Sequence, residues 1–541
     1  MNVAEAVIKC LENEGVSTVF GYPGGAILPI YEALRHSTIR HVLVRNEQSS
    51  VHMASGYARE SKHVGVCIST SGPGATNMIT GIATAYMDSI PLIAITGQVR
   101  RDYIGKDVFQ EADIVGATEP FTKHNFLVTK AEDIPMIMAK AIKIATTGRM
   151  GPVLIDIPKD IQMESIEFKT IKEVEIAGYN PTVVGHTGQL KRIIRRIKSA
   201  QSPVIIAGGG VVLADAKAEL AKLSEIRKIP VIHTLMGIGG FPMNSATYVG
   251  IIGYHGDEIC ERIVQRADLI IIVGARMSDR ATKNFSLIRP EADIVHIDID
   301  PSEIGKIVNY QIPIVGDAKI ILNDILEKLT AFEGACWAQE WLDEAKKTYQ
   351  IDLNYEETEG VCPRMFLKAL SNQLSPDAVI AADVGQNQIW TAKHIQYEND
   401  RKFLSSGGLG TMGYSLSAAI GAKMASPERT VVAVMGDAGI QMLLGELGTL
   451  SEIGHKVIVV ILNNNLLGMV RELQDNAYGS KSHFGIHFSI SPDFVKIGEG
   501  YSISGCVVKS NHEIPSAIEA ALTAKGSFII DCRVDAAADS L

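Results

Sequence analysis

The sequence predicts an α/β protein with three doubly wound domains, each built on a mostly parallel sheet. Short apolar runs rich in Val and Ile alternate with helix-length segments along the chain, which is typical of strands covered by helices on both faces. The chain has 541 residues, and a single hydrophobic core stops growing at about 250–300 residues. Several domains of one α/β class are therefore expected.

Two segments with mixed charge and no strand signal, 165–186 and about 330–360, are interpreted as linkers. They predict domains at 1–165, 185–330 and 360–541. The sequence leaves open whether the outer two are related. The runs expected to form strands are 41–44, 64–70, 92–96, 152–158, 203–208, 230–234, 269–274, 294–300, 378–383, 430–437, 457–463 and 527–535.

Composition disfavours several classes of protein. The formal net charge of −10 disfavours non-specific nucleic-acid binding. The longest apolar runs, such as 269–273 and 457–462, are far shorter than the roughly 18 residues of a membrane span, and the N-terminus lacks a signal-peptide pattern. The seven cysteines include no C-x-x-C pair, which favours reduced thiols over disulfides or a zinc site. We expect a cytoplasmic enzyme with no nucleic-acid or membrane partner.

Two apolar runs of the third domain end in polar motifs that suit a metal. GDAG (436–439) follows the first run, and NNN (463–465) follows the next. In a parallel sheet, neighbouring strands deliver their carboxyl ends to one edge, about 5 Å apart. Asp437 and Asn464 could then share a Mg²⁺ ion that also binds a phosphate, approached through the glycines and the next helix N-terminus. Polar turns are the alternative, and the pairing of the two motifs disfavours them.

These motifs and others in the same order resemble the catalytic large subunit of acetolactate synthase (acetohydroxyacid synthase), a thiamine diphosphate-dependent family. The resemblance runs from about residue 3 to 535. Its motifs include FGYPGGA (20–26), RNEQ (45–48), TSGPGATN (70–77), GPVLIDIPKD (151–160), DVGQNQIW (383–390), GGLGTMGYSL (407–416) and LGMV (467–470). It implies a pyrimidine-binding, a central FAD-type and a diphosphate-binding domain, in that order.

The resemblance implies that pyruvate is decarboxylated on thiamine diphosphate and that its two-carbon unit is transferred to a second 2-keto acid. The acceptor is pyruvate or 2-ketobutyrate, in the first common step of branched-chain amino-acid biosynthesis. One alternative is a flavin-dependent pyruvate oxidase or another thiamine-dependent decarboxylase. Another is a silent nucleotide-binding or scaffold protein, which the joint presence of Glu47, Asp437 and Asn464 disfavours.

The resemblance also assigns the diphosphate side of the cofactor site. Mg²⁺ would be bound by Asp437, the side chain of Asn464 and the main-chain oxygen of Leu466. The other residues assigned to thiamine diphosphate in the third domain are Val384, Gly385, Gln386, Asn387, Gly410, Met412, Ala438, Gly439 and Met469. Met412 would support the bent cofactor, and a core methionine is its alternative role.

Glu47 matches the glutamate that protonates the aminopyrimidine ring, and removal from water would favour the neutral acid that this step needs. Without the resemblance, a solvated helix-start acid paired with Arg45 would be the better interpretation. The chain has Asn46 where the family more usually has histidine. Because the family's glutamate and diphosphate site come from different subunits, a homodimer is the smallest active unit implied. A tetramer and a small regulatory subunit stay open.

Other matches surround the substrate. Gly25 would offer a backbone N–H near the reacting carbon, with Gln110 and Lys123 as further catalytic residues. Phe109 and Lys159 would line the substrate channel, and a surface position is the alternative for Lys159. Leu473 stands where the family often has a tryptophan, and one methylene of contact is worth only about 1–3 kcal/mol, so the acceptor preference stays open. The C-terminal tail, RVDAAADSL (533–541), is shorter than the resemblance leads us to expect, and a shorter closing tail would retain the cofactor less well.

The central domain carries a glycine-rich turn, IIAGGGVVLADA (205–216), which is not a strict G-x-G-x-x-G motif and is also typical of a tight βα turn. The resemblance implies FAD here, although RMSDR (276–280) departs from the usual RFDDR. The residues assigned to FAD are Arg149, Gly208, Gly209, Gly210, Thr234, Leu235, Met236, His255, Gly274, Arg276, Asp279, Arg280, Asp298, Ile299 and Asp317.

Overall fold

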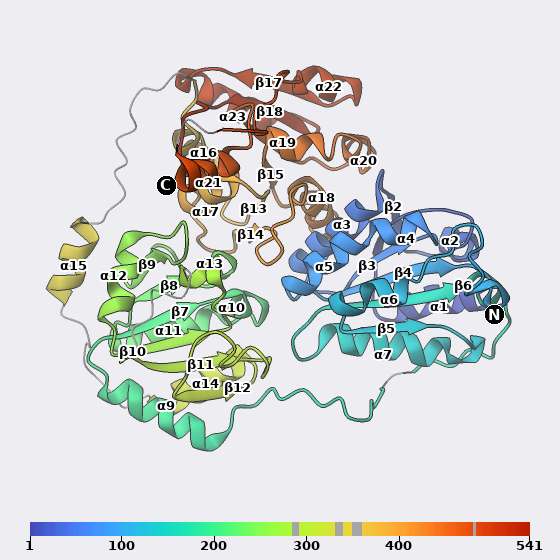
Figure 1. Ribbon diagram of the computed structural model, residues 1–541, viewed down its shortest axis with the longest axis horizontal. Coiled ribbons are helices and arrows are strands. Elements are labelled where there is room, and N and C mark those ends of the chain that lie inside the picture. The colour runs from blue at the N-terminus through green and yellow to red at the C-terminus, as the bar shows by residue number, and fades with distance from the viewer. Residues whose placement is uncertain (172, 284–290, 330–338, 349–359, 480–482, 541) are drawn as a thin grey trace.

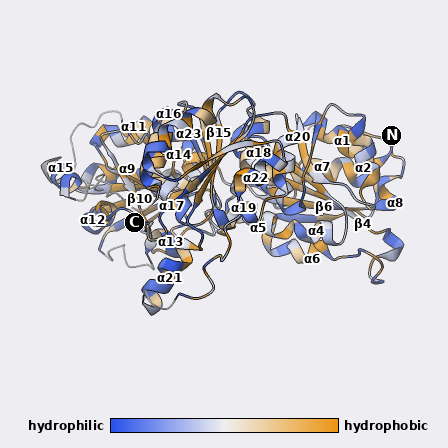
Figure 2. Cartoon of the chain, turned by 90° about the horizontal axis from the view of Figure 1, so that it is seen from above, coloured by the Kyte–Doolittle hydropathy of each residue, from blue (hydrophilic) through white to orange (hydrophobic). Residues whose placement is uncertain are grey.

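The computed structural model describes residues 1–171, 173–283, 291–329, 339–348, 360–479 and 483–540 (Figure 1). The described chain forms three six-stranded sheets, and all of their strand pairs are parallel. Helices cover both faces of each sheet (Figure 1), and the strands between them are rich in hydrophobic residues, coloured orange in Figure 2. The predicted fold class is confirmed.

The two outer sheets have the same topology. The first comprises β1 (Thr18–Tyr22), β2 (Arg40–Leu43), β3 (Gly65–Ser69), β4 (Leu92–Gln98), β5 (His124–Leu127) and β6 (Pro152–Pro158), in the order β2-β1-β3-β4-β6-β5. The third comprises β13 (Val379–Ala382), β14 (Lys402–Leu404), β15 (Val431–Gly436), β16 (Ile458–Asn463), β17 (Ser504–Val508) and β18 (Phe528–Arg533), in the order β14-β13-β15-β16-β18-β17. In both sheets the second strand of the domain lies on one side of the first strand and the third lies on its other side, so the direction of winding reverses between β1 and β3 and between β13 and β15.

The central sheet has the strand order of dinucleotide-binding folds. It comprises β7 (Pro203–Ala207), β8 (Val231–His233), β9 (Tyr248–Ile251), β10 (Leu269–Val273), β11 (Asp293–Asp298) and β12 (Ile312–Val315), in the order β12-β11-β10-β7-β8-β9. Winding reverses between β7 and β10, and ligands of such sheets bind at the carboxyl ends of the strands on either side of this reversal.

The helices connect these strands. The first domain contains α1 (Val3–Asn13), α2 (Leu28–Arg35), α3 (Glu47–Ser61), α4 (Pro73–Asn77), α5 (Ile79–Met87), α6 (Ile114–Thr118), α7 (Ile134–Thr146) and α8 (Lys159–Gln162). The next are α9 (Thr187–Ser199), α10 (Gly209–Leu213), α11 (Lys217–Arg227), α12 (Glu258–Arg266), α13 (Asp279–Thr282), α14 (Ala318–Leu329) and α15 (Gln339–Thr348). The last are α16 (Pro363–Gln373), α17 (Gln386–His394), α18 (Ser415–Ala425), α19 (Asp437–Gln441), α20 (Glu446–Glu452), α21 (Gly468–Tyr478), α22 (Phe494–Gly500) and α23 (Ile514–Thr523).

The described helices include none with the length and apolar character to cross a membrane. The predicted linker at 330–360 lies mostly outside the described residues, apart from α15. The domain boundaries at 165, 185, 330 and 360 stay predictions.

All twelve runs expected to be strands overlap strands of the structure. The described residues contain six further strands, β1, β5, β9, β12, β14 and β17, and all except β1 lie at the edge of a sheet. An edge strand is short and partly exposed, as at β5, so its sequence lacks a continuous apolar run.

One hydrophobic core joins the two outer domains. Strand residues of the first sheet, such as Cys67 and Ala94, and of the third, such as Ala433 and Val459, belong to one buried cluster. Helices α3 and α18 cross inside it at close range, as the blue and brown ribbons in Figure 1 show. A Cβ atom on Gly421 would lie 1.8 Å from the Met53 carbonyl oxygen, so the backbones approach too closely for any side chain.

We therefore expect Gly421→Ala to destabilise the packing of the two outer domains. Forcing extra volume into a well-packed core costs about 1–3 kcal/mol or more, which corresponds to a fall of roughly 2–10 °C in the thermal unfolding midpoint. Gly500→Ala is the matched control, because a Cβ there meets no heavy atom within 4 Å. Equal midpoints for the two variants in differential scanning calorimetry would contradict the close α3–α18 contact.

Candidate active site

The two polar motifs of the third domain follow neighbouring strands. β15 and β16 pair in parallel with Gly436 opposite Leu462, so Asp437 and Asn464 leave the sheet at the same edge. The backbone N–H of Asn464 hydrogen-bonds to the Asp437 carboxylate. The structure therefore brings together the two side chains that the sequence predicts to share a cation.

Asp437 is a buried carboxyl group, only 2% exposed. Burial, reinforced by the nearby Asp531, raises the pKa of Asp437 to about 7, and its backbone hydrogen bonds and Arg533 offset part of this shift. Arg533 itself pairs with Asp531 at 2.7 Å. A buried carboxylate without an ion-pair partner is costly; Asp437 forms no ion pair with the described residues, and a divalent ion beside it would remove that cost.

Asn464 lies in a network that also holds the loop after β16. Its side-chain nitrogen donates to Gln386 Oε1 at 3.0 Å, and its side-chain oxygen accepts a long bond from the Leu466 N–H at 3.4 Å. Asn465 between them adopts a left-handed φ of 59°. The oxygens of Asn464 and of the Leu466 carbonyl keep acceptor capacity for a metal. The described residues contain no cluster of three His, Cys, Asp or Glu side chains suited to a metal, so a site here would use this mixed oxygen set.

Sequence reasoning did not identify the role of Asp383, which organises the loop that carries Met412. The buried Asp383 carboxylate accepts the backbone N–H groups of Val384 at 2.8 Å, Gly413 at 2.9 Å and Ser415 at 3.2 Å. Burial raises the pKa of Asp383 to about 6, and these hydrogen bonds limit the rise. The carboxyl end of β13 is thereby tied to the 410–415 loop.

Glu47 begins α3 directly after β2, with the Asn46 side chain capping the helix by accepting the Gln48 N–H. Its carboxylate accepts a 2.9 Å hydrogen bond from Asn77. Arg45 pairs with Glu452 at 2.5 Å, so the expected alternative of an Arg45–Glu47 pair does not match the structure. In the described part of the chain, no hydrogen bond or ion pair joins Glu47 to Asp437 or to Asn464.

Several predicted substrate residues share the carboxyl edge of the first sheet with Glu47. Gly25 follows β1, Lys159 begins α8 after β6, and Phe109 and Gln110 lie on the loop after β4. Phe109 is 87% exposed. Gln110 has a left-handed φ of 59°, and its backbone packs against the position that a Cβ on Gly72 would occupy. Their roles stay predictions.

Lys123 lies elsewhere. It precedes β5, at the amino edge of the first sheet, so the structure separates it from Glu47 within one chain. Its ammonium donates to the carbonyl of Ile144, to the carbonyl of Thr147 at 2.7 Å and to the hydroxyl of Tyr179 at 3.0 Å. Burial lowers the pKa of Lys123 to about 8. These contacts cap the carboxyl end of α7, and a catalytic role for Lys123 stays a prediction.

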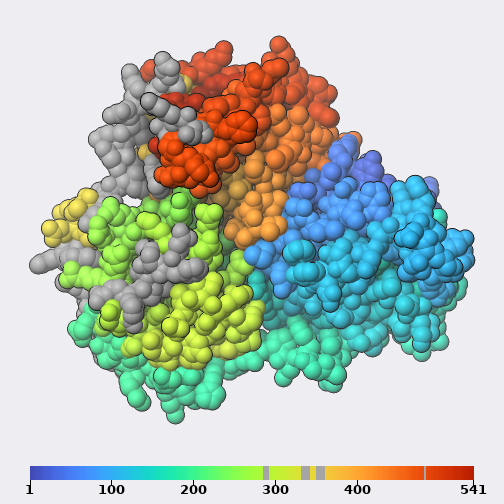
Figure 3. Space-filling model, viewed as in Figure 1, coloured from blue at the N-terminus to red at the C-terminus, as the bar shows by residue number. Residues whose placement is uncertain are grey.

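A large cavity is lined by residues of all three domains, whose blue, green to yellow and orange surfaces meet near the centre of Figure 3. Its volume is about 1040 Å³, at the upper end of the roughly 300–1000 Å³ that ligand pockets usually have. The carboxyl edge of the central sheet forms one wall, and residues that precede β3, β4 and β6 of the first domain form another. This size and position suit a dinucleotide.

Most of the predicted flavin residues line this cavity: Arg149, Gly209, Gly210, Thr234, Leu235, Met236, His255, Gly274, Arg276, Arg280, Asp298, Ile299 and Asp317. Of the third-domain residues predicted for thiamine diphosphate or substrate, it reaches Val384, Gly385, Gly410, Met469 and Leu473. Gly208 and Asp279 lie outside the lining. A Cβ on Gly208 would lie 2.2 Å from the Gly274 oxygen, so Gly208 allows the turns after β7 and β10 to pack together.

Arg149 and Asp317, two of the predicted flavin residues, already have protein partners. Arg149 pairs with Asp300 at 3.1 Å and with Glu303 at 2.9 Å, which links the first and central domains. Asp317 accepts the N–H groups at the start of α14 and caps that helix. Structural roles therefore accompany any contact of these two residues with a ligand.

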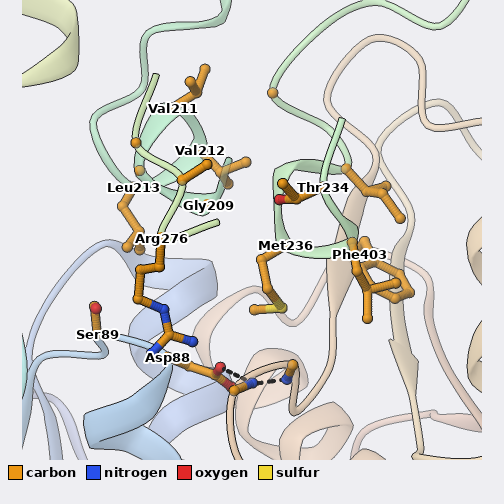
Figure 4. A pocket seen from close by; sticks show the side chains of 18 of the residues that line it. Asp88, Ser89, Gly209, Val211, Val212, Leu213, Thr234, Met236, Arg276 and Phe403 are labelled. Atoms are coloured by element: carbon orange, nitrogen blue, oxygen red, sulfur yellow. Dashed lines mark hydrogen bonds between the residues drawn. The ribbon is translucent and has the colours of Figure 1, made fainter. Parts of the chain in front are cut away.

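Asp88 was not predicted, and no local motif marks it. It is buried in the wall of the cavity and accepts the N–H groups of Gly407 and Gly408 at 3.3 and 2.8 Å (Figure 4). Arg59 pairs with it at 3.3 Å, and burial raises the pKa of Asp88 although Arg59 and Arg276 oppose the rise. Arg276 extends from the central domain toward this carboxylate. Asp88 therefore connects the first domain to the third, close to the Arg276 side chain of the central domain.

Comparisons with known proteins agree with this geometry. Residues 1–117 match the family described as thiamine pyrophosphate enzyme, N-terminal TPP binding domain, residues 190–327 the central domain, and residues 383–532 the C-terminal TPP binding domain. The chain is 45% identical to a probable acetolactate synthase large subunit of Methanocaldococcus jannaschii, over 99% of this chain and 92% of the relative. It is 44% identical to the acetolactate synthase isozyme 3 large subunit of Escherichia coli, over 96% and 92%. For the acetolactate synthase large subunit of Corynebacterium glutamicum, the identity is 43% over 96% and 84%.

The packing of Gly468 allows a test of whether the cofactor binds at the carboxyl edge of the third sheet. A Cβ there would lie 1.8 Å from Gln386 Oε1 and 2.9 Å from the Asn464 side-chain nitrogen, so Gly468→Ala would displace both amides. We expect a loss of about 10–100-fold in Mg²⁺-dependent affinity for thiamine diphosphate, as for other residues that orient metal ligands. Fluorescence titration would measure it against Gly526→Ala, where a Cβ is free of contacts. Unchanged affinity would place the cofactor away from this edge.

Proposed function

The chain belongs to the thiamine pyrophosphate enzymes and, within them, to the family of acetolactate synthase large subunits, and on this premise we propose that it forms 2-acetolactate from two molecules of pyruvate. One pyruvate loses CO₂, and its two remaining carbons join the carbonyl carbon of the second. 2-Ketobutyrate is the other proposed acceptor, in the first common step of branched-chain amino-acid synthesis. A pyruvate oxidase is not favoured, since the relatives reported above carry the acetolactate synthase name.

The observation that carries the proposal is the buried carboxylate of Asp437, which lies beside Asn464 at the carboxyl edge of the third sheet and forms no ion pair with the described residues. We assign Mg²⁺ to Asp437, Asn464 and the Leu466 carbonyl, a set of oxygen ligands of the kind that Mg²⁺ takes together with phosphate. Thiamine diphosphate, when bound there, supplies the stabilised carbanion that the reaction needs.

Glu47 is the proposed acid on the other half of the site. Asn77 orients its carboxylate by a 2.9 Å hydrogen bond, so a proton held on the other oxygen can be given to a ring nitrogen of the cofactor. Because no hydrogen bond or ion pair joins Glu47 to Asp437 or Asn464 within the described chain, we assign these two halves to different subunits of a homodimer. Phe109 on the first domain and Phe484 on the third are 87% and 88% exposed, and a second copy that covers them would remove these aromatic side chains from water.

FAD is the proposed occupant of the cavity between the domains. Gly208 and Gly210 pack closely on Gly274, so the turns after β7 and β10 lie together at the reversal point of the central sheet, where ligands of such sheets bind. Arg276 is a cation on its wall. Because the relatives are named large subunits, we also propose a smaller regulatory partner. A cytoplasmic location and the choice between dimer and tetramer stay predictions.

Acetolactate formation tests the function. Anaerobic incubation with pyruvate, thiamine diphosphate, Mg²⁺ and FAD should give acetolactate, and omission of thiamine diphosphate or Mg²⁺ should abolish it. Glu47→Gln should lower kcat about 10²–10⁴-fold, the usual contribution of general acid–base catalysis, with an unchanged unfolding midpoint. Acetate or acetyl phosphate formed with an electron acceptor, in place of acetolactate, would support the oxidase instead.

Flavin content tests the cavity. Arg276→Gln removes a cation from its wall, and we expect at least roughly tenfold weaker flavin binding, since a hydrogen bond to a charged group is worth about 1.5–3 kcal/mol. The readout is flavin fluorescence released on denaturation. Arg262→Gln is the control, because Arg262 pairs with Glu258 on the exposed face of α12. Equal flavin content in both variants would exclude Arg276 from the flavin site.

A further inference from the structure

The turn that delivers Glu47 is held by a side chain of another domain. The backbone N–H groups of Arg45 and Asn46 both donate to Glu446 Oε1, at 2.9 and 3.0 Å. Glu446 begins α20 in the third domain, about 400 positions later in the chain, and is only 2% exposed. Thr449 donates to its second oxygen at 2.8 Å. The carboxylate of Glu446 is therefore fully engaged, and it contacts the turn just before Glu47.

Other residues in and just before α20 also contact this turn and the end of β2. The Thr449 hydroxyl also lies 3.1 Å from the carbonyl of Leu43, the last residue of β2. Cβ atoms on Gly445 and Gly448 would lie 3.3 and 3.1 Å from the Arg45 side chain, so glycine at both positions lets the helix lie against it. One turn of α20 thus contacts the end of β2 and the turn that follows, and leaves the side chain of Glu47 directed elsewhere.

These contacts restrict the position of the backbone just before Glu47. The N–H groups that precede a helix have no partner in the helix itself and need one from outside. Glu446 is this partner for the N–H groups of Arg45 and Asn46. The Asn46 side chain then caps the first turn of α3 by accepting the Gln48 N–H. With the backbone held by Glu446 and the carboxylate held by Asn77, little freedom is left to the position of Glu47.

We propose that Glu446 is a positioning residue for catalysis: its carboxylate oxygen holds the Arg45–Asn46 turn, so that Glu47 meets the cofactor in the geometry that proton transfer requires. This inference rests on the proposed role of Glu47. Misplacement of a catalytic group by about 1 Å can cost about 10²-fold in rate. Both oxygens of Glu446 accept hydrogen bonds from the protein, so Glu446 acts on the reaction through the turn that it holds.

Two conservative variants separate geometry from charge. Glu446→Gln keeps the length and one oxygen that can accept both N–H groups, and we expect kcat to stay within about threefold of the wild type. Glu446→Asp keeps the charge but is one methylene too short, and we expect kcat to fall about 10–100-fold while the KM for pyruvate changes little. A smaller loss for Glu446→Asp than for Glu446→Gln would overturn the proposal in favour of an electrostatic role.

The matched control is Glu452→Gln on the same helix. Glu452 also contacts Arg45, through the guanidinium at 2.5 Å, but its side chain is 59% exposed and does not touch the backbone of the turn. We expect its kcat to equal that of the wild type. A loss equal to that of Glu446→Asp would mean that the Arg45 side chain matters rather than the held turn, and would overturn the proposal.

A double-mutant cycle shows whether Glu446 acts through Glu47. If it does, Glu446→Asp should cost little further activity in a Glu47→Gln background, because the group it positions is already disabled. An equal loss in both backgrounds would indicate a merely structural role and overturn the proposal. Failure of the proposed function would look different, since the wild type would then form no acetolactate or Glu47→Gln would keep full activity.

Discussion

The close crossing of α3 and α18 is the contact on which the catalytic geometry depends. Gly56 and Gly421 remove the side chains that would otherwise separate the helices, and the first and third domains consequently share one core. Helix α3 starts with Glu47, and α18 follows the loop that carries Met412. Dense packing makes such an interface rigid, so the start of α3 and the loop before α18 keep a fixed relation within each chain.

Four buried carboxylates lie at the loops and turns of the candidate site and of the cavity. Asp383, Asp437, Asp88 and Glu446 are all buried, and burial raises the pKa of each. Asp383 and Glu446 are satisfied by backbone N–H groups, and Asp88 by backbone N–H groups and Arg59. Asp437 also accepts backbone hydrogen bonds, and it lies beside Asn464 at the carboxyl edge of the third sheet.

The central domain contributes through its topology. Its strand order places the turns after β7 and β10 side by side, and the glycines there bring two backbones together at the mouth of the cavity. The remaining wall comes from the amino edge of the first sheet and from the third domain. The first domain therefore presents one edge to this cavity and the opposite edge, with Glu47, to a different site.

The sequence alone determined the α/β class, the twelve strands with continuous apolar runs, and the pairing of Asp437 with Asn464, because burial and turn chemistry leave local patterns. The edge strands β5, β9, β12, β14 and β17 were not predicted, because half-exposed strands have a weak hydrophobic pattern in the sequence. Only the tertiary structure decided that Glu446 holds the turn before Glu47, that Asp88 ties two domains together, and that Lys123 lies at the opposite edge from Glu47. Those relations join residues far apart in the chain, and no local periodicity or motif records which distant surfaces will pack together.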